Sequence, residues 1–233
     1  MKNKKILYII IGILLLVSVI CIYKFINSKN SFNNDKFSDI VIDKENKVIN
    51  VLTSPDMLYN LSEPSIIEGL SEYIALVKID TIDGVSNINK KTNEFVSTYT
   101  YGKLTILKMI KGNIDSENIS YIRSGGEISY NNWIKGQLSP EKLQKMVENS
   151  GIDTDNLKIV DKYEGDISIE TNKVYLAYMH YEPSFNEENE YVIHGFQYGL
   201  REIKEDENSN IKVKNNDTGK WENLSSIIDT NMK

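Results

Sequence analysis

One long segment, residues 94–112, constrains the fold of this chain more than any other feature. Its sequence reads EFVSTYTYGKLTILKMIKG, and its β-branched and aromatic residues are typical of one long β-strand. The apolar side chains, however, change face twice along it. They are Tyr99 and Tyr101 at odd positions, Leu104 and Ile106 at even ones, and Leu107 and Met109 at odd ones again. Because side chains alternate strictly along a regular strand, this pattern requires a bulge or a bend, which is easiest at Gly102.

The remaining segments predict a small barrel around this bent strand, since such a strand can serve both halves of a closed wall. Further strands are predicted in residues 39–52 (two strands around a charged turn), 73–83, 118–123, 174–179, 190–203 (two strands hinged at 195–199) and 210–214, with a polar loop at 84–93. Helices are predicted near Pro55 and Pro64, in 139–151 and in 223–230. The fold class is therefore mainly β: a small OB-like β-barrel with one inserted helix and short flanking helices, preceded by a single N-terminal transmembrane helix.

The N-terminal apolar run, ILYIIIGILLLVSVICIY at residues 6–23, carries no charge. As a helix it would be about 27 Å long, close to the ~30 Å hydrocarbon core of a bilayer. The preceding lysines, Lys2, Lys4 and Lys5, predict a cytoplasmic N-terminus. A cleaved signal peptide needs a small-x-small site, and a lipoprotein needs a small residue where Ile20 stands. We favour an uncleaved signal-anchor, with a cleaved and secreted form as the alternative.

These features predict the organisation of the chain. Residues 1–5 form a basic cytoplasmic tail, residues 6–26 a transmembrane signal-anchor, residues 27–37 a polar linker, and residues 38–233 an extracytoplasmic OB-like barrel domain. The expected location is the cell membrane, with a single pass and the C-terminal domain outside.

Charge and cysteine content exclude several functions. Four of the 27 basic residues and none of the 33 acidic residues precede residue 27, so the rest holds 23 basic and 33 acidic side chains, a net charge of −10. That sign repels nucleic acid, and no nucleic-acid partner is expected. The single cysteine, Cys21, lies in the apolar run, which leaves the outer domain without disulfides, cysteine nucleophiles or cysteine-bound zinc.

A set of short motifs lies in order between residues 70 and 203. They are Thr98–Tyr101, Lys111-Gly112, Gly125-Gly126, Val174–Leu176 and Gly195–Gly199. In this order they resemble a group of uncharacterised anchored or secreted proteins of Gram-positive bacteria. More distantly the layout is similar to the OB-like barrel of netrin-type domains, as in tissue inhibitors of metalloproteinases. The resemblance implies a fold and a location but no activity, and no inhibitory residue is carried over because netrin-type domains are disulfide-stapled.

The double glycine Gly125-Gly126 has two interpretations. Its consecutive backbone N–H groups could form an anion-binding nest, helped by Arg123. Alternatively it marks a barrel corner, where the chain turns with positive φ. We favour the corner, because no phosphate-binding motif follows.

Other constellations do not assign a site. Ser139-Pro140-Glu141-Lys142 matches the S-x-x-K pattern of penicillin-binding enzymes, but it is also an ordinary helix start, with Gly151 as the stop. His180 and His194 could hold zinc only with a further ligand, and H-E-x-x-H is absent. Residues 153–158 begin like an EF-hand loop but have Lys158 where glycine is required. We therefore assign no catalytic, cofactor-binding or metal-binding residue and expect no cofactor.

Two functions remain open. The first is a membrane-tethered, non-catalytic module that binds an unknown extracytoplasmic protein, peptide or wall ligand. Its surface would be the 127–172 insertion with Trp133 or, in competition, the tyrosine-rich strand 98–101. The alternative is a hydrolase that uses carboxylates of 127–172 on cell-wall or peptide material, since such enzymes leave no motif in a single sequence.

Overall fold

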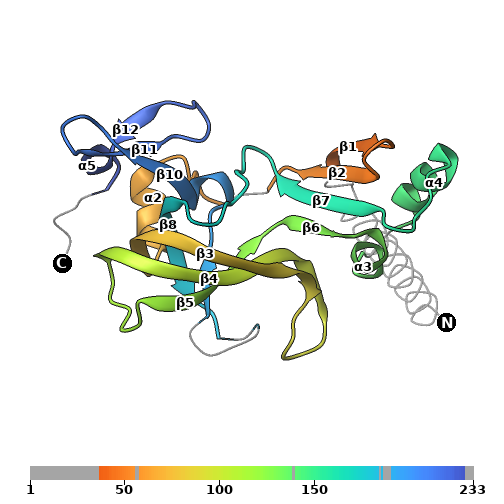
Figure 1. The fold of residues 1–233 in the computed structure, drawn as a ribbon, viewed down its shortest axis with the longest axis horizontal. Helices are drawn as coiled ribbons and strands as arrows, with labels where there is room; N and C mark the ends of the chain where they lie inside the picture. Colours follow the sequence, from red (N-terminus) through yellow and green to blue (C-terminus); the bar gives the residue numbers. More distant parts are fainter. Residues whose placement is uncertain (1–36, 56–57, 138–139, 184, 186–189, 229–233) are drawn as a thin grey trace, which may run out of the picture. The chain divides into compact units, whose positions relative to one another are not determined.

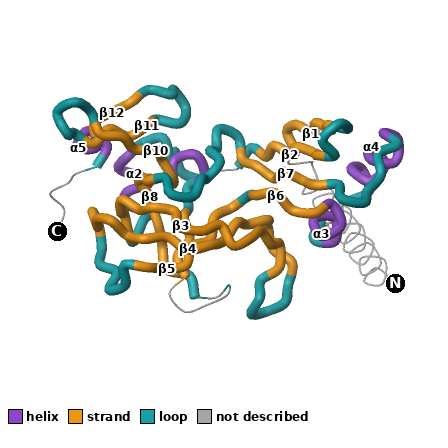
Figure 2. Tube along the Cα trace, in the orientation of Figure 1, coloured by secondary structure: helices purple, strands orange, loops and turns teal. Residues whose placement is uncertain are grey.

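The computed structural model describes residues 37–55, 58–137, 140–183, 185 and 190–228. They belong to one compact unit that begins at Phe37. The predicted basic tail, the transmembrane segment 6–26 and linker residues 27–36 lie outside the described residues. Strands dominate the described chain, as Figure 2 shows, so the prediction of a mainly β protein is confirmed.

Five strands close into a ring, and Figure 1 labels all of them except the one that closes it. They are β3 (Tyr73–Ile88), β4 (Phe95–Lys111), β5 (Asn118–Ser124), β8 (Val174–Tyr181) and β9 (Glu190–Ile193). β3, β4 and β5 follow one another as antiparallel neighbours, and β8 is antiparallel to β3. β9 then closes the ring, because it pairs parallel with β5 on one side and antiparallel with β8 on the other.

The bend in β4 is present, and its cause lies partly in the opposite strand. The β3–β4 register skips Asp80 and Asp83, so both extra residues belong to β3. Gly102 pairs with Ile82 between these two irregularities. A Cβ at Gly102 would lie 2.1 Å from the Thr81 carbonyl oxygen, so the backbones approach too closely for any side chain. The glycine at the bend was therefore predicted correctly, although the bulged residues are its neighbours across the hairpin.

Two predictions about this hairpin are wrong. Leu107 was expected on an apolar face, but it is the extra residue between Ile106 and Lys108 and is 52% exposed. Residues 84–93 were expected to form a loop, yet β3 continues to Ile88. The polar sequence is tolerated there because it pairs with the first half of β4.

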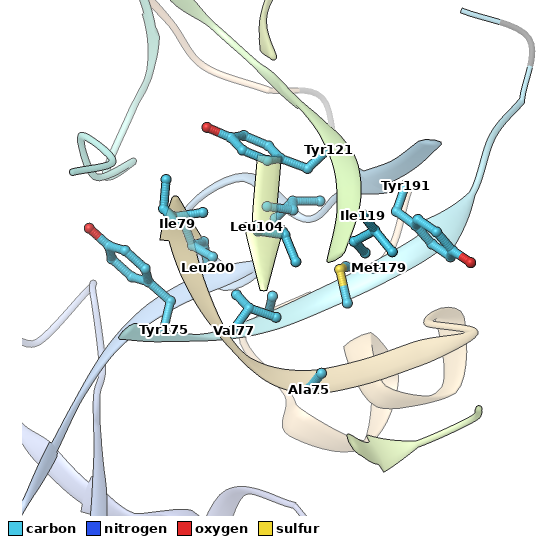
Figure 3. Packing of buried hydrophobic residues seen from close by; sticks show 12 residues of the cluster. Ala75, Val77, Ile79, Leu104, Ile119, Tyr121, Tyr175, Met179, Tyr191 and Leu200 are labelled. Atoms are coloured by element: carbon cyan, nitrogen blue, oxygen red, sulfur yellow. The ribbon is translucent and has the colours of Figure 1, made fainter. Parts of the chain in front are cut away.

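The interior of the ring is a closely packed core (Figure 3). Its buried members are Ala75, Val77, Ile79, Leu104, Ile119, Tyr121, Tyr175, Ala177, Met179, Tyr191, Ile193 and Leu200. The alternate β8 side chains Leu176 and Tyr178 are equally buried in a second cluster on the outside of the ring. β8 is therefore apolar on both faces, as predicted, because each face is covered.

The second cluster is built by elements that cover this outer side. They are α2 (Pro64–Leu70), the 3-10 turn η1 (Phe196–Tyr198), β10 (Leu200–Glu205), β11 (Ile211–Lys214) and α5 (Leu224–Ile227). β12 (Trp221–Asn223) pairs with β11 at the edge of this sheet. α2 starts at its proline as predicted. Ser54 and Pro55 lie in coil, and residues 56–57 of that predicted helix start lie outside the described residues.

The predicted role of residues 127–172 needs correction. They were expected to interrupt the strands with one helix, but they supply β6 (Gly126–Ser129) and β7 (Lys158–Tyr163) to a second sheet. The N-terminal hairpin of β1 (Phe37–Asp43) and β2 (Val48–Thr53) completes it in the order β1-β2-β7-β6. Because β2 runs parallel to β7 across a hundred residues of chain, no local pattern could reveal this pairing.

Two helices cover one face of the second sheet. α3 (Tyr130–Lys135) was not predicted, whereas α4 (Glu141–Ser150) was. α4 begins after Pro140 rather than at it and ends at Gly151 with φ of 67°, as expected for a glycine stop. Ser139, the predicted cap, lies outside the described residues. The opposite face of this sheet is left to line a cleft.

Candidate functional site

Gly125 and Gly126 form the corner where the chain leaves β5 and enters β6. Their φ angles are +86° and +144°, in the region that favours glycine. The Gly125 N–H donates to the Thr98 carbonyl at 2.7 Å, and the Gly125 carbonyl accepts from the Thr100 hydroxyl at 2.7 Å. A Cβ on Gly126 would lie 2.5 Å from Thr100 Oγ1. The corner interpretation is confirmed. The anion nest is wrong, because the Gly125 N–H already donates to a carbonyl of the protein and cannot bind an anion.

A cleft of about 440 Å³ lies at this corner. The ring contributes Ile82, Val85, Thr100 and Arg123, the second sheet contributes Asn50, Glu127, Val160 and Lys162, and the turn after β7 contributes residues 166–169. A volume of this size suits a small molecule or a short stretch of a larger ligand. The Gly125-Gly126 corner therefore shapes a cleft, although it does not bind through its own N–H groups.

A buried ion pair forms one wall of the cleft. Arg123 and Asp166 are bonded to each other, and each side chain is only 7% exposed. Arg123 also donates through Nη1 to the Ile167 carbonyl at 2.8 Å, while its Nε has no hydrogen-bond partner among the described residues. Burial raises the pKa of Asp166, and the Arg123 charge opposes that rise. Sequence reasoning missed Asp166, because no pattern shows that its turn folds onto β5.

Asp161 is a second carboxylate of the cleft wall and is half-buried. Its Oδ2 accepts a hydrogen bond from Trp133 Nε1 at 3.1 Å. Burial raises the pKa of Asp161, whereas the hydrogen bonds from Trp133 and Thr98 lower it.

Trp133 itself is 2% exposed, so its expected place on a recognition surface is wrong. Its indole packs in the core between α3 and the second sheet, so within residues 127–172 only β6, β7 and the turn after β7 line the cleft.

The competing surface, strand 98–101, is also largely closed. Thr98, Tyr99 and Thr100 are buried. The Tyr99 hydroxyl donates to the Ile88 carbonyl at 2.8 Å, and the ring packs edge-on against Phe185. The Tyr101 ring lies 6.0 Å from the Tyr99 ring, centre to centre, and is covered by the Lys90 ammonium group, 4.2 Å from its centre. These rings therefore have structural partners already.

The two histidines do come together, but not as a metal site. The His180 and His194 rings lie 5.3 Å apart, centre to centre. Across the described residues, no group of three side chains suited to metal coordination is found. Burial and the neighbouring His180 lower the pKa of His194 to about 4, so the ring is neutral at physiological pH.

His194 also contacts a serine that the sequence did not single out. Its Nε2 lies 3.0 Å from Ser71 Oγ, a spacing that a nucleophile and its base would have. However, the Ser71 hydroxyl donates to the Ile67 carbonyl at 2.6 Å, so it accepts from His194 rather than giving up its proton to it. Ser71 is also 2% exposed. The pair is therefore structural.

Neither the comparisons with known proteins nor the search for membrane-spanning helices assigns a function to these residues. The described residues contain no helix that is both long and apolar enough to cross a bilayer, and the predicted span lies outside them. The resemblance to anchored Gram-positive proteins and to netrin-type barrels stays a prediction. A scan against protein-family models and searches of curated proteins and of solved structures find no match to this chain.

Proposed function

We propose that this chain is a membrane-tethered, extracytoplasmic module that binds a ligand without catalysing a reaction. The observation that carries the proposal is the cleft at the Gly125-Gly126 corner, which has the volume of a ligand site. Its charged groups already have hydrogen-bond partners within the protein: Arg123 bonds with Asp166, Glu127 with Lys158, Asp161 with the Trp133 N–H, and Lys162 with the Ser168 hydroxyl. Such walls favour a neutral or zwitterionic ligand held by polar groups and by the apolar residues between them.

We further propose that the five-stranded ring is an OB-type barrel. The support is its connectivity, with three antiparallel strands in succession, a fourth that returns to the first, and a fifth parallel to the third. The long insertion with α3 and α4 falls between the third and fourth of these strands. OB-type barrels carry binding sites on their walls and loops, which is consistent with a binding role.

The membrane tether rests on the sequence. The uncharged run 6–23 and the lysines before it support a single span with the domain outside. In intact cells stripped of their wall, added protease should degrade the segment from residue 38 onward. A protected C-terminal domain would show that the orientation is wrong.

A photocrosslinking experiment tests the cleft. A photoreactive amino acid in place of Ser168, an exposed residue of the cleft, should capture a specific adduct in intact cells. The same group in place of Ser62, an exposed residue that does not line the cleft, is the matched control. Equal adducts at both positions, or none at Ser168, would contradict a ligand in the cleft.

The alternative function, a carboxylate-dependent hydrolase, has one observation in its favour. Asp161 and Asp166 both line the cleft, and burial raises the pKa of each, as is common for catalytic acids. Both are bonded into the structure, however, which favours a structural role. Hydrolysis of purified peptidoglycan or peptide by the full-length chain, abolished by Asp161→Asn or Asp166→Asn with the fold retained, would establish the hydrolase instead.

A further inference from the structure

A separate cavity of about 540 Å³ opens where β3 and β9 begin and β8 ends. Three tyrosines from these strands and the turn 113–116 between β4 and β5 line it. The Tyr73 and Tyr191 rings lie 5.5 Å apart at 84°, and the Tyr181 and Tyr191 rings 5.3 Å apart at 58°. The rings are therefore inclined to one another like the walls of a corner. In Figure 3 the Tyr191 ring lies at the end of the core cluster with its hydroxyl directed away from Ala75 and Met179.

The turn is shaped to meet these rings. Gly112 has φ of +75°, and a Cβ there would lie 2.7 Å from Tyr73 Cδ1, so only glycine lets the turn approach this ring. Asp115 faces the same space and accepts a hydrogen bond from the Asn113 amide at 2.9 Å. Burial raises the pKa of Tyr191, and Tyr73, Tyr181 and Asp115 raise it further, so the phenol stays neutral beside a carboxylate. Tyr181, 39% exposed, leaves one side of the cavity open to solvent.

The surrounding charge is negative. Asp115 lines the cavity itself, and Glu72 and Glu182 are chain neighbours of Tyr73 and Tyr181. Glu72 is held beside the cavity because its Oε2 accepts the Tyr181 N–H at 3.2 Å. Lys111, at the end of β4, is directed elsewhere and donates to the Glu68 carbonyl at 2.6 Å. Aromatic faces combined with carboxylates and an acidic domain favour a cationic ligand.

We propose that this cavity binds a basic side chain of a peptide or protein partner, a lysine ammonium or an arginine guanidinium. The cation lies against the tyrosine rings, with Asp115 as its counter-charge. The proposal rests on the proposed binding role of the domain, but it uses a cavity distinct from the corner cleft. Failure of one experiment therefore does not decide the other.

The test uses the full-length chain in a nonionic detergent and two fluorescent peptides. One contains lysine in a glycine–serine background, and the other is the same peptide with its lysine side chains acetylated. Fluorescence anisotropy at about 50 mM salt, where exposed charges are weakly screened, should show binding of the lysine peptide only. Tyr181→Ala should weaken binding by about fivefold, the loss expected when roughly 1 kcal/mol of cation–π attraction is removed. Asp115→Asn should weaken it as well.

Two further variants distinguish the cavity from the general charge of the domain. Tyr181→Phe keeps the ring and should bind within about twofold of the unchanged protein, because the attraction comes from the ring face. Tyr59→Ala removes an exposed tyrosine that does not line the cavity and should leave the affinity unchanged. The proposal is overturned if neither peptide binds, if the acetylated peptide binds equally well, or if Tyr181→Ala has no larger effect than Tyr59→Ala.

Discussion

Replacing Arg123 by methionine should destabilise the protein strongly at neutral pH and less at acidic pH. Arg123 and Asp166 are each 7% exposed, so the substitution leaves a buried carboxylate without its counter-charge. Breaking a buried pair in this way typically costs about 3–5 kcal/mol. Burial already raises the pKa of Asp166 against the opposing Arg123 charge, and removing that charge raises it further. The folded variant therefore takes up a proton before the unfolded chain does, and stability returns as the pH falls through the raised pKa.

Urea unfolding of the full-length chain in a nonionic detergent, followed by near-ultraviolet circular dichroism at several pH values, measures this effect. Asp166→Asn should be destabilised without recovery at low pH, because a guanidinium cannot lose its proton in this range. The double variant Arg123→Met with Asp166→Leu should be more stable than either single variant, since no uncompensated charge remains. Lys173→Gln, which breaks an exposed pair with Glu170, is the control and should not change the unfolding midpoint.

A loss of less than about 1 kcal/mol for Arg123→Met at neutral pH, the range of an exposed ion pair, would contradict this prediction. A loss that does not depend on pH would contradict it as well. Either result would mean that water reaches the pair in the cleft and screens it.

Three more predictions follow from the geometry. Because the folded pKa of His194 is about 4 and the unfolded value is 6.5, stability should fall by up to about 3 kcal/mol as the pH drops from 6.5 to 4, and His194→Gln should flatten this slope in a urea series. Gly126→Ala should lower the melting temperature more than Gly151→Ala, because both have positive φ but only Gly126 also meets Thr100 Oγ1, at 2.5 Å. Leu104→Ala should cost about 2–5 kcal/mol of unfolding free energy, whereas the exposed Leu107→Ala should change it little.

Local elements were largely readable from the sequence. The long strand around Gly102, the central strand 174–179, the helix that ends at Gly151 and the corner at Gly125-Gly126 all follow from side-chain periodicity or from the φ that glycine allows. These signals involve residues within a few positions of one another. They therefore depend little on contacts with distant segments, unlike the polar residues 84–88, which are a strand because they pair with β4.

The sequence by itself determined the core strands of the ring, the bend at Gly102 and which catalytic and metal-binding motifs are missing, while the tertiary structure decided the second sheet and what each segment packs against. Only folding sets β2 beside β7, buries the Trp133 ring of α3 against the second sheet, and brings Asp166 onto Arg123. The tyrosines at 73, 181 and 191 likewise come from three strands and meet only because β9 closes the ring. The physical reason is that pairing and burial depend on residues far apart in the chain, whose contacts leave no period in the sequence.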